Sequence, residues 1–372
     1  MKTNNEILNQ SGYSLVELMI AMALGTFLLA GVIQIFSSSK QSYRLQDGQS
    51  RVQENARYVL ELLGRDVREA GYTGCRGLDK ISIIRIGNAP LPIFDVKSAV
   101  IGRWWDQGSG SWSNAVPTAV TGVVAGTDMI TIQKGESCGA TLTGNTTASN
   151  ANIQVVSPNS CRLSAGDATM VTDCSTAHIL RATNVSSGGG SETIAHAVSA
   201  NTATHLCTGY PNSYPTSNAG ACGSGLSKTY TSPPAQLLKF ISYSYFIRPG
   251  VNGLNSLWRL DNTRGISARN PIELVEGVED MQITYGIGAG GIASTYADAA
   301  TFPTPPAAPG GAVPNDWSDV ISARIALLFE SADANLTIGN QVYTWNGATV
   351  TSSDGRIRRV FSTTINIRNR ML

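Results

Sequence analysis

Glu17 is the residue whose type and position raise the first chemical question. It is the only charged residue in the segment 15–36, where Gln34 is the only other strongly polar side chain. A carboxylate at the centre of a lipid bilayer costs about 2.5 to 3.5 kcal/mol, so an acid in such a segment usually has a partner. Glu17 therefore needs a partner.

Residues that could carry catalysis, or hold a metal or cofactor, are sparse. The three histidines, His178, His196 and His205, form no H-E-x-x-H pattern, and we expect them at the surface or in turns. There is no G-x-S-x-G elbow, Walker A loop or EF-hand loop. Residues 286–291 satisfy G-x-G-x-x-G but lead into a proline-rich stretch instead of a helix, which favours a hairpin tip. We expect no enzymatic activity, no cofactor and no metal site.

The cysteines form an even set without any C-x-x-C pair, which favours disulfides over a metal site. Spacing alone does not select one pairing among the many that six thiols allow. Short loops favour Cys161 with Cys174 and Cys207 with Cys222, which leaves Cys75 for Cys138. Six buried free thiols are the alternative.

The apolar segment 15–36 is long enough to cross a bilayer as an α-helix. A secretory signal carries its basic region directly before the apolar run and its cleavage site after it. Here a polar segment ends at Gly12, and the apolar run follows at once. A retained assembly helix, a plain membrane anchor and a cleaved signal are the three interpretations.

The helix is expected to continue beyond the apolar segment to about residue 71. One stripe of apolar side chains recurs at helical spacing, with Gly71 as a terminator; its members are Leu45, Val52, Ala56, Val59, Leu63 and Val67. A long coiled coil is the alternative, but Gly48 and Gly64 interrupt the heptads. We expect this half of the helix to dock on the apolar face of a C-terminal sheet.

Most of the remaining chain has the two-residue alternation of β-strands, clearest in residues 321–330. Similar patterns begin at Ile81, Leu237, Ser256, Asp280 and Arg359. They predict an α+β fold in which a long N-terminal helix packs on an antiparallel β-sheet head. Residues of about 100–235, rich in Ser, Thr, Asn and Gly, are expected to contain a disulfide-stapled β or loop insertion.

Charge and aromatic patterns give two further expectations. Because 27 Lys and Arg nearly balance 26 Asp and Glu, we expect no nucleic-acid partner. Trp104, Trp105 and Trp112 lie in a Gly/Ser-rich stretch, where they are either half-buried loop aromatics or a patch for a partner or glycan.

The hexapeptide GYSLVE, residues 12–17, resembles the type IV prepilin signature. The resemblance implies that a prepilin peptidase cuts between Gly12 and Tyr13 and methylates the new Tyr13 amine. Glu17 then pairs with this amine on its own or a neighbouring subunit. The expected division of the chain is a leader at 1–12, a membrane and assembly helix at 13–71 and a β-rich head at 72–372.

Three segments of the head, at residues 240–250, 274–287 and 358–370, resemble PilW-type minor pilins. The resemblance implies a low-abundance subunit at or near a pilus tip that helps to initiate assembly. Its expected partners are other minor and major pilins, the prepilin peptidase, the inner membrane before assembly, and a tip adhesin. The head is expected in the periplasm and then at the cell surface. A J-type pseudopilin of type II secretion and a tip-binding module are the alternatives.

Overall fold

The computed structural model describes most of the chain between Gly12 and Arg370. Left out are 1–11, 76, 89, 93, 95–97, 107–108, 114–115, 118–119, 145, 148–151, 198, 202–225, 227, 265–269, 290, 303–315 and 371–372.

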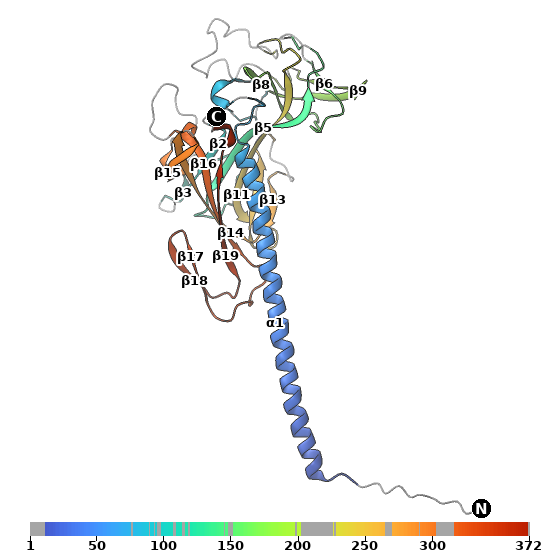
Figure 1. Ribbon diagram of the computed structural model, residues 1–372, viewed down its shortest axis with the longest axis vertical. Coiled ribbons are helices and arrows are strands. Elements are labelled where there is room, and N and C mark those ends of the chain that lie inside the picture. The colour runs from blue at the N-terminus through green and yellow to red at the C-terminus, as the bar shows by residue number, and fades with distance from the viewer. Residues whose placement is uncertain are drawn as a thin grey trace, which may run out of the picture.

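One long helix, α1 (Leu15–Arg68, 54 residues), carries a β-rich head at its C-terminal end (Figure 1). At 1.5 Å per residue the helix is about 80 Å long. Ser14 before it is extended, and Gly71 just after it has φ +75°, a conformation that favours glycine. Short 3₁₀ turns are η1 (Leu78–Lys80), η4 (Ala299–Thr301), η5 (Trp317–Asp319) and η6 (Arg368–Arg370). The predicted α+β architecture is confirmed.

The main sheet has eight strands in the order β1-β8-β7-β11-β12-β13, and β5 pairs with both β11 and β2. Its members are β1 (Ser82–Arg85), β2 (Val100–Arg103), β5 (Met129–Thr141), β7 (Ala168–Thr172), β8 (Thr176–Arg181), β11 (Gln236–Pro249), β12 (Asn255–Asp261) and β13 (Ile272–Glu276). All pairs are antiparallel except β1 with β8, which is parallel and departs from the predicted antiparallel pattern.

A second sheet, in the order β15-β14-β16-β19, follows directly from the first. It contains β14 (Val278–Ala289), β15 (Ile292–Asp298), β16 (Val320–Glu330) and β19 (Arg358–Asn366). Gly277 joins β13 to β14 with φ +79°, and a Cβ there would lie 2.7 Å from the Glu330 carbonyl oxygen. The antiparallel pair β14–β15 confirms the hairpin predicted around residues 286–291.

Three smaller strand groups complete the head. They are β3 (Trp105–Asp106) with β4 (Ser111–Trp112), β6 (Asn152–Val156) with β10 (Ser191–Ala195) and β9 (Asn184–Gly188), and β17 (Gln341–Trp345) with β18 (Ala348–Ser352). Within the region 100–235, β2, β5, β7 and β8 belong to the main sheet, whereas β6, β9 and β10 form a sheet of their own. That three-stranded sheet lies at the end of the head farthest from the N-terminus (Figure 1).

The disulfides correct two of the predicted pairings. Cys75 is bonded to Cys174 and Cys138 to Cys161, so the predicted pairs Cys161–Cys174 and Cys75–Cys138 are wrong. Sequence proximity was misleading because the chain after β6 folds back on β5, where the Ser160 N–H donates to the Cys138 carbonyl at 2.9 Å. Cys207 and Cys222, the third predicted pair, lie outside the described residues.

Candidate functional site

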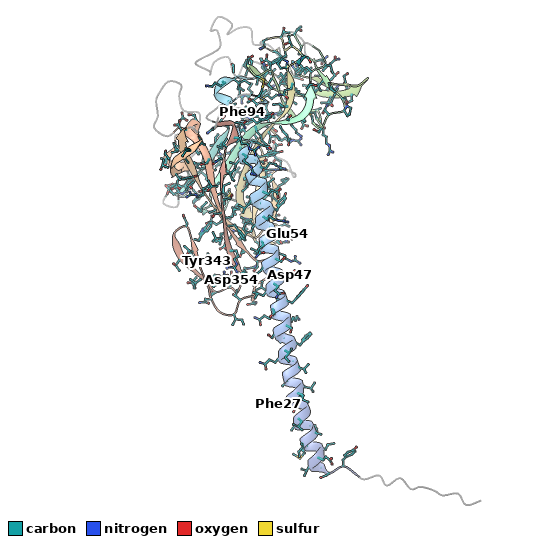
Figure 2. All side chains as sticks on the ribbon, viewed as in Figure 1. Phe27, Asp47, Glu54, Phe94, Tyr343 and Asp354 are labelled. Atoms are coloured by element: carbon teal, nitrogen blue, oxygen red, sulfur yellow. A yellow bond between two sulfur atoms is a disulfide. The ribbon has the colours of Figure 1, made fainter. Side chains whose placement is uncertain are left out.

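The N-terminal part of α1 forms a stem that no other part of the described chain covers. Its apolar side chains are exposed, among them Leu15 (73%), Phe27 (79%) and Phe36 (71%). Figure 2 shows Phe27 on this bare part of the stem, whereas Asp47 and Glu54 lie farther along, where the helix reaches the head. Among the described helices, α1 is long and apolar enough to cross a membrane. Burial of the stem therefore requires lipid or other protein chains.

The residues predicted for processing and charge pairing lie at the start of the stem, and all are exposed to solvent. Gly12 and Tyr13 precede the helix, and Tyr13 is 86% exposed. Glu17 lies in the first turn of α1 and is exposed, near backbone N–H groups whose partial positive charge favours an acid. Its side chain is accessible to a positively charged group of another chain. The leader, residues 1–11, lies outside the described residues.

The Thr26 hydroxyl and the backbone of the stem are hydrogen-bonded within the helix. The Thr26 hydroxyl lies 3.0 Å from the carbonyl oxygens of Met22 and of Ala23, so it is hydrogen-bonded without water. The helical backbone satisfies its own N–H and C=O groups in the same way. This arrangement suits an apolar environment.

The C-terminal half of α1 joins the stem to the head along a seam of apolar side chains. The predicted stripe is confirmed, because five of its members are buried and Leu45 is half-buried; the five are Val52, Ala56, Val59, Leu63 and Val67. They share one core cluster with residues of β14, β16 and β19, such as Ile325 and Ile365. Burial of these apolar side chains holds the C-terminal half of α1 against the head.

A buried polar network crosses the same seam. Lys134 Nζ on β5 lies 2.9 Å from Asp66 Oδ1 and 2.6 Å from Glu69 Oε2 on the helix. The Tyr245 hydroxyl donates to Asp66 Oδ2 at 2.5 Å, and burial raises the pKa of Tyr245 well above its ordinary value. Lys134 and Asp66 are almost inaccessible, so each charge depends on the other. Sequence reasoning missed this pair, although Asp66 adjoins the apolar stripe and Lys134 interrupts an apolar strand.

The aromatic patch is partly assembled. Trp105 and Trp112 pair across the β3–β4 hairpin, with ring centroids 5.3 Å apart in an edge-to-face arrangement. Trp104 packs against the main core and Trp112 against the smaller cluster that contains Val120. All three tryptophans are half-buried.

The histidines depart from the prediction. His178 and His196 are fully buried, whereas a surface or turn position was expected for both, and His205 lies outside the described residues. His178 Nδ1 lies 2.6 Å from the Tyr230 hydroxyl, and burial lowers its pKa to about 3, helped by the nearby His196 and Lys228. The signal for burial was the apolar company of His178, because Ala177, Ile179 and Leu180 beside it in β8 are all buried. Over the described residues, no group of His, Cys, Asp and Glu is arranged to hold a metal ion.

Comparison with known families gives two matches. A family model described as type IV pilus-assembly protein W matches residues 244–369, which contain β14, β16, β19 and the β17–β18 hairpin. A model described as the prokaryotic N-terminal methylation motif matches residues 7–33, which contain the start of the stem. Comparisons with curated proteins and with solved structures give no match.

Proposed function

We propose that this chain, a PilW-like type IV pilin, is a minor pilin that initiates pilus assembly at or near the filament tip. The observation that carries the proposal is the bare apolar stem with a single carboxylate, Glu17, in its first turn. Such a stem is held in the inner membrane before assembly and among other stems after it. The pilin matches support a structural role.

Processing at Gly12 creates the partner that Glu17 requires. A prepilin peptidase removes the leader, and the new Tyr13 amine, methylated and positive, lies in the same apolar surroundings as Glu17. Two opposite charges attract strongly where water is excluded, so their pairing offsets the cost of burying either. Because Glu17 is exposed, the amine of a neighbouring subunit reaches it as the stems pack together.

The size of the head supports a place at the filament end. Beyond the stem the chain has about 300 residues, including a separate sheet (β6, β9 and β10) and two disulfides. A repeating helical lattice favours compact subunits, whereas an end accepts a larger one. At this position the head contacts other minor pilins, the first major pilins and a tip adhesin, after its stay on the periplasmic side of the membrane.

Replacement of Glu17 tests the proposal. In a strain with its pilus machinery intact, Glu17→Ala is expected to lower the number of surface filaments at least about tenfold, because one lost buried charge pair is worth several kcal/mol. Glu54→Ala, on the same helix but outside the apolar segment, is the matched control and is expected to leave filament number unchanged. Immunoblots check that both variants accumulate in the membrane.

Two results would overturn the proposal. One is wild-type piliation in the Glu17→Ala strain. The other comes from mass spectrometry of the native protein, where the expected N-terminus is a methylated Tyr13. An intact Met1, or a start beyond Phe36, would contradict retention of the stem.

A further inference from the structure

The β17–β18 hairpin is a part of the head to which the proposed function gives no role. It lies between β16 and β19 in the chain, and Figure 1 places it beside the stem at the end of the head from which the stem emerges. Figure 2 shows Tyr343 and Asp354 at this end, level with Asp47 on the helix. The hairpin therefore lies close to the surface that the stem must share with its neighbours.

One side of the hairpin is attached firmly to the second sheet. The Gln341 side chain pairs with the Arg358 backbone as a peptide group would, since its Nε2 donates to the carbonyl and its Oε1 accepts from the N–H, both at 2.7 Å. Trp345 Nε1 donates to Asp280 Oδ2 at 2.7 Å near the hairpin tip. With both ends of β17 bonded to the sheet, the hairpin holds one orientation before any partner arrives.

The base of the hairpin also rests on α1, just beyond the uncovered stem. Leu336 and Ile357, in the connections on either side of the hairpin, lie against Gly48 of α1. A Cβ at Gly48 would come within 2.7 Å of Leu336 Cδ1, so the glycine permits the close approach. The position of the hairpin is thus coupled to the axis of the stem.

The opposite side of the hairpin is exposed and uncharged. Val342 (62% exposed) pairs with Thr351, and Thr344 pairs with Thr349, so these four side chains share the outer face. Ile338, just before β17, is 90% exposed. Residues 338–353 contain no charged side chain at all.

An uncharged outer face and edge of this kind are unusual for a solvent-facing hairpin. Exposed strands are templates for pairing with other chains, and proteins protect them with charges, prolines or bulges. β13, the edge strand of the main sheet that contacts the stem, carries Glu273 and Glu276. The β17–β18 pair has β-branched residues and no such protection, which indicates a surface that becomes covered.

We infer that the outer face of the β17–β18 hairpin docks against the head of a neighbouring pilin subunit in the assembled filament. The inference rests on the proposed function, because stems packed side by side bring a neighbouring head against this end of the molecule. Figure 1 places the hairpin beside α1 at the end of the head from which the exposed stem emerges, so a subunit that covers the stem comes next to the hairpin. The lack of charge requires an uncharged surface on the partner, rich in β-branched or small polar side chains.

Site-specific photocrosslinking in piliated cells tests this contact. The probe is p-benzoylphenylalanine at Thr344, with the same probe at Thr295 of β15 as the matched control, since both are exposed strand threonines. We expect an adduct at Thr344 whose second component mass spectrometry identifies as another pilin, and none at Thr295. An adduct with lipid or with a second copy of this chain, or no adduct in cells with normal filaments, would overturn the inference.

A double substitution that introduces two negative charges gives an independent test. Val342→Asp with Thr344→Asp is expected to reduce incorporation of the chain into filaments at least about tenfold, because two charges would be buried against an uncharged partner. Thr295→Asp is the control, and circular dichroism of each full-length variant in detergent checks its fold. Normal incorporation of the folded double variant, with Glu17→Ala still defective, would refute the docking surface and leave the proposed function standing. Normal incorporation of both would refute the proposed function as well.

Discussion

The seam between stem and head and the region farthest from the stem are held together by different forces. At the seam, the apolar stripe of α1 packs on β14, β16 and β19 in the largest core cluster, and both described disulfides lie elsewhere. The distal region, residues 138–201, has a smaller cluster around Ile153, Val155 and Ile194. The Cys138–Cys161 bond lies within this region, and the Cys75–Cys174 bond ties it to the segment that follows α1. The apolar packing at the seam therefore needs no oxidation, whereas the distal region depends on disulfides that form in an oxidising compartment.

Removal of a disulfide is expected to give the largest difference between the two regions. Cys75→Ser with Cys174→Ser opens a 99-residue loop and is expected to cost about 4 to 5 kcal/mol, against about 1 kcal/mol less for the 23-residue loop of Cys138–Cys161. Urea unfolding of the full chain in detergent measures the loss, and hydrogen exchange locates it. Faster exchange at the seam amides, such as that of Leu63, would show that the two regions are not independent.

The charge network at the seam provides the reciprocal perturbation. Lys134→Met leaves the Asp66 carboxylate buried without its cation and is expected to destabilise the protein by about 3 to 5 kcal/mol. Exchange should accelerate at the seam and not around Ile153. Lys134→Met combined with Asp66→Asn removes both charges and is expected to recover at least half of the loss. If stability does not recover, packing of the aliphatic part of the Lys134 side chain, and not its charge, matters at this position.

A change of pH is expected to act on the two regions in opposite directions. Burial, together with the nearby Asp280 and Asp298, raises the pKa of Asp128 to about 8, although its Oδ2 accepts from the Ile283 N–H on β14. The Asp128 carboxyl therefore keeps its proton in the folded state up to about pH 8, whereas in the unfolded state it loses the proton near pH 4. This contribution to stability therefore falls as the pH rises from about 4 to about 8, by at most about 1.4 kcal/mol per pH unit.

His178 in the distal region has the reverse dependence. The pKa of His178 in the folded state is about 3, below its ordinary value of 6.5. Between these two pH values the unfolded state is protonated at His178 and the folded state is not. Stability from this group falls as the pH drops from about 6.5 to about 3. Hydrogen exchange at pH 5 and pH 7 should show a looser distal region and a tighter β14 at the lower pH. Asp128→Asn should abolish the second effect, and an unchanged pH response in that variant would contradict the assignment.

Periodicity explains why so much of the fold could be predicted. The strands β14, β16 and β19 alternate, and β11 is a long run that is buried over most of its length. The apolar stripe of α1 has regular helical spacing, so these elements are all visible in local sequence. The β17–β18 hairpin was not predicted, because its strands are short and their outward side chains are mostly polar. Pairings between distant residues, such as Lys134 with Asp66 or Cys75 with Cys174, depend on the order of strands in the sheet, which local patterns do not encode.

The bond between Cys75 and Cys174 has a mechanical consequence. Cys75 lies seven positions after the last residue of α1, and Cys174 lies at the turn between β7 and β8. A force along the axis of α1 is therefore transmitted to the main sheet through the Cys75–Cys174 bond at that turn. The non-covalent contacts of the seam transmit the rest of the force. When tension acts along α1, this disulfide link carries part of the load that the hydrogen bonds between strands would otherwise bear.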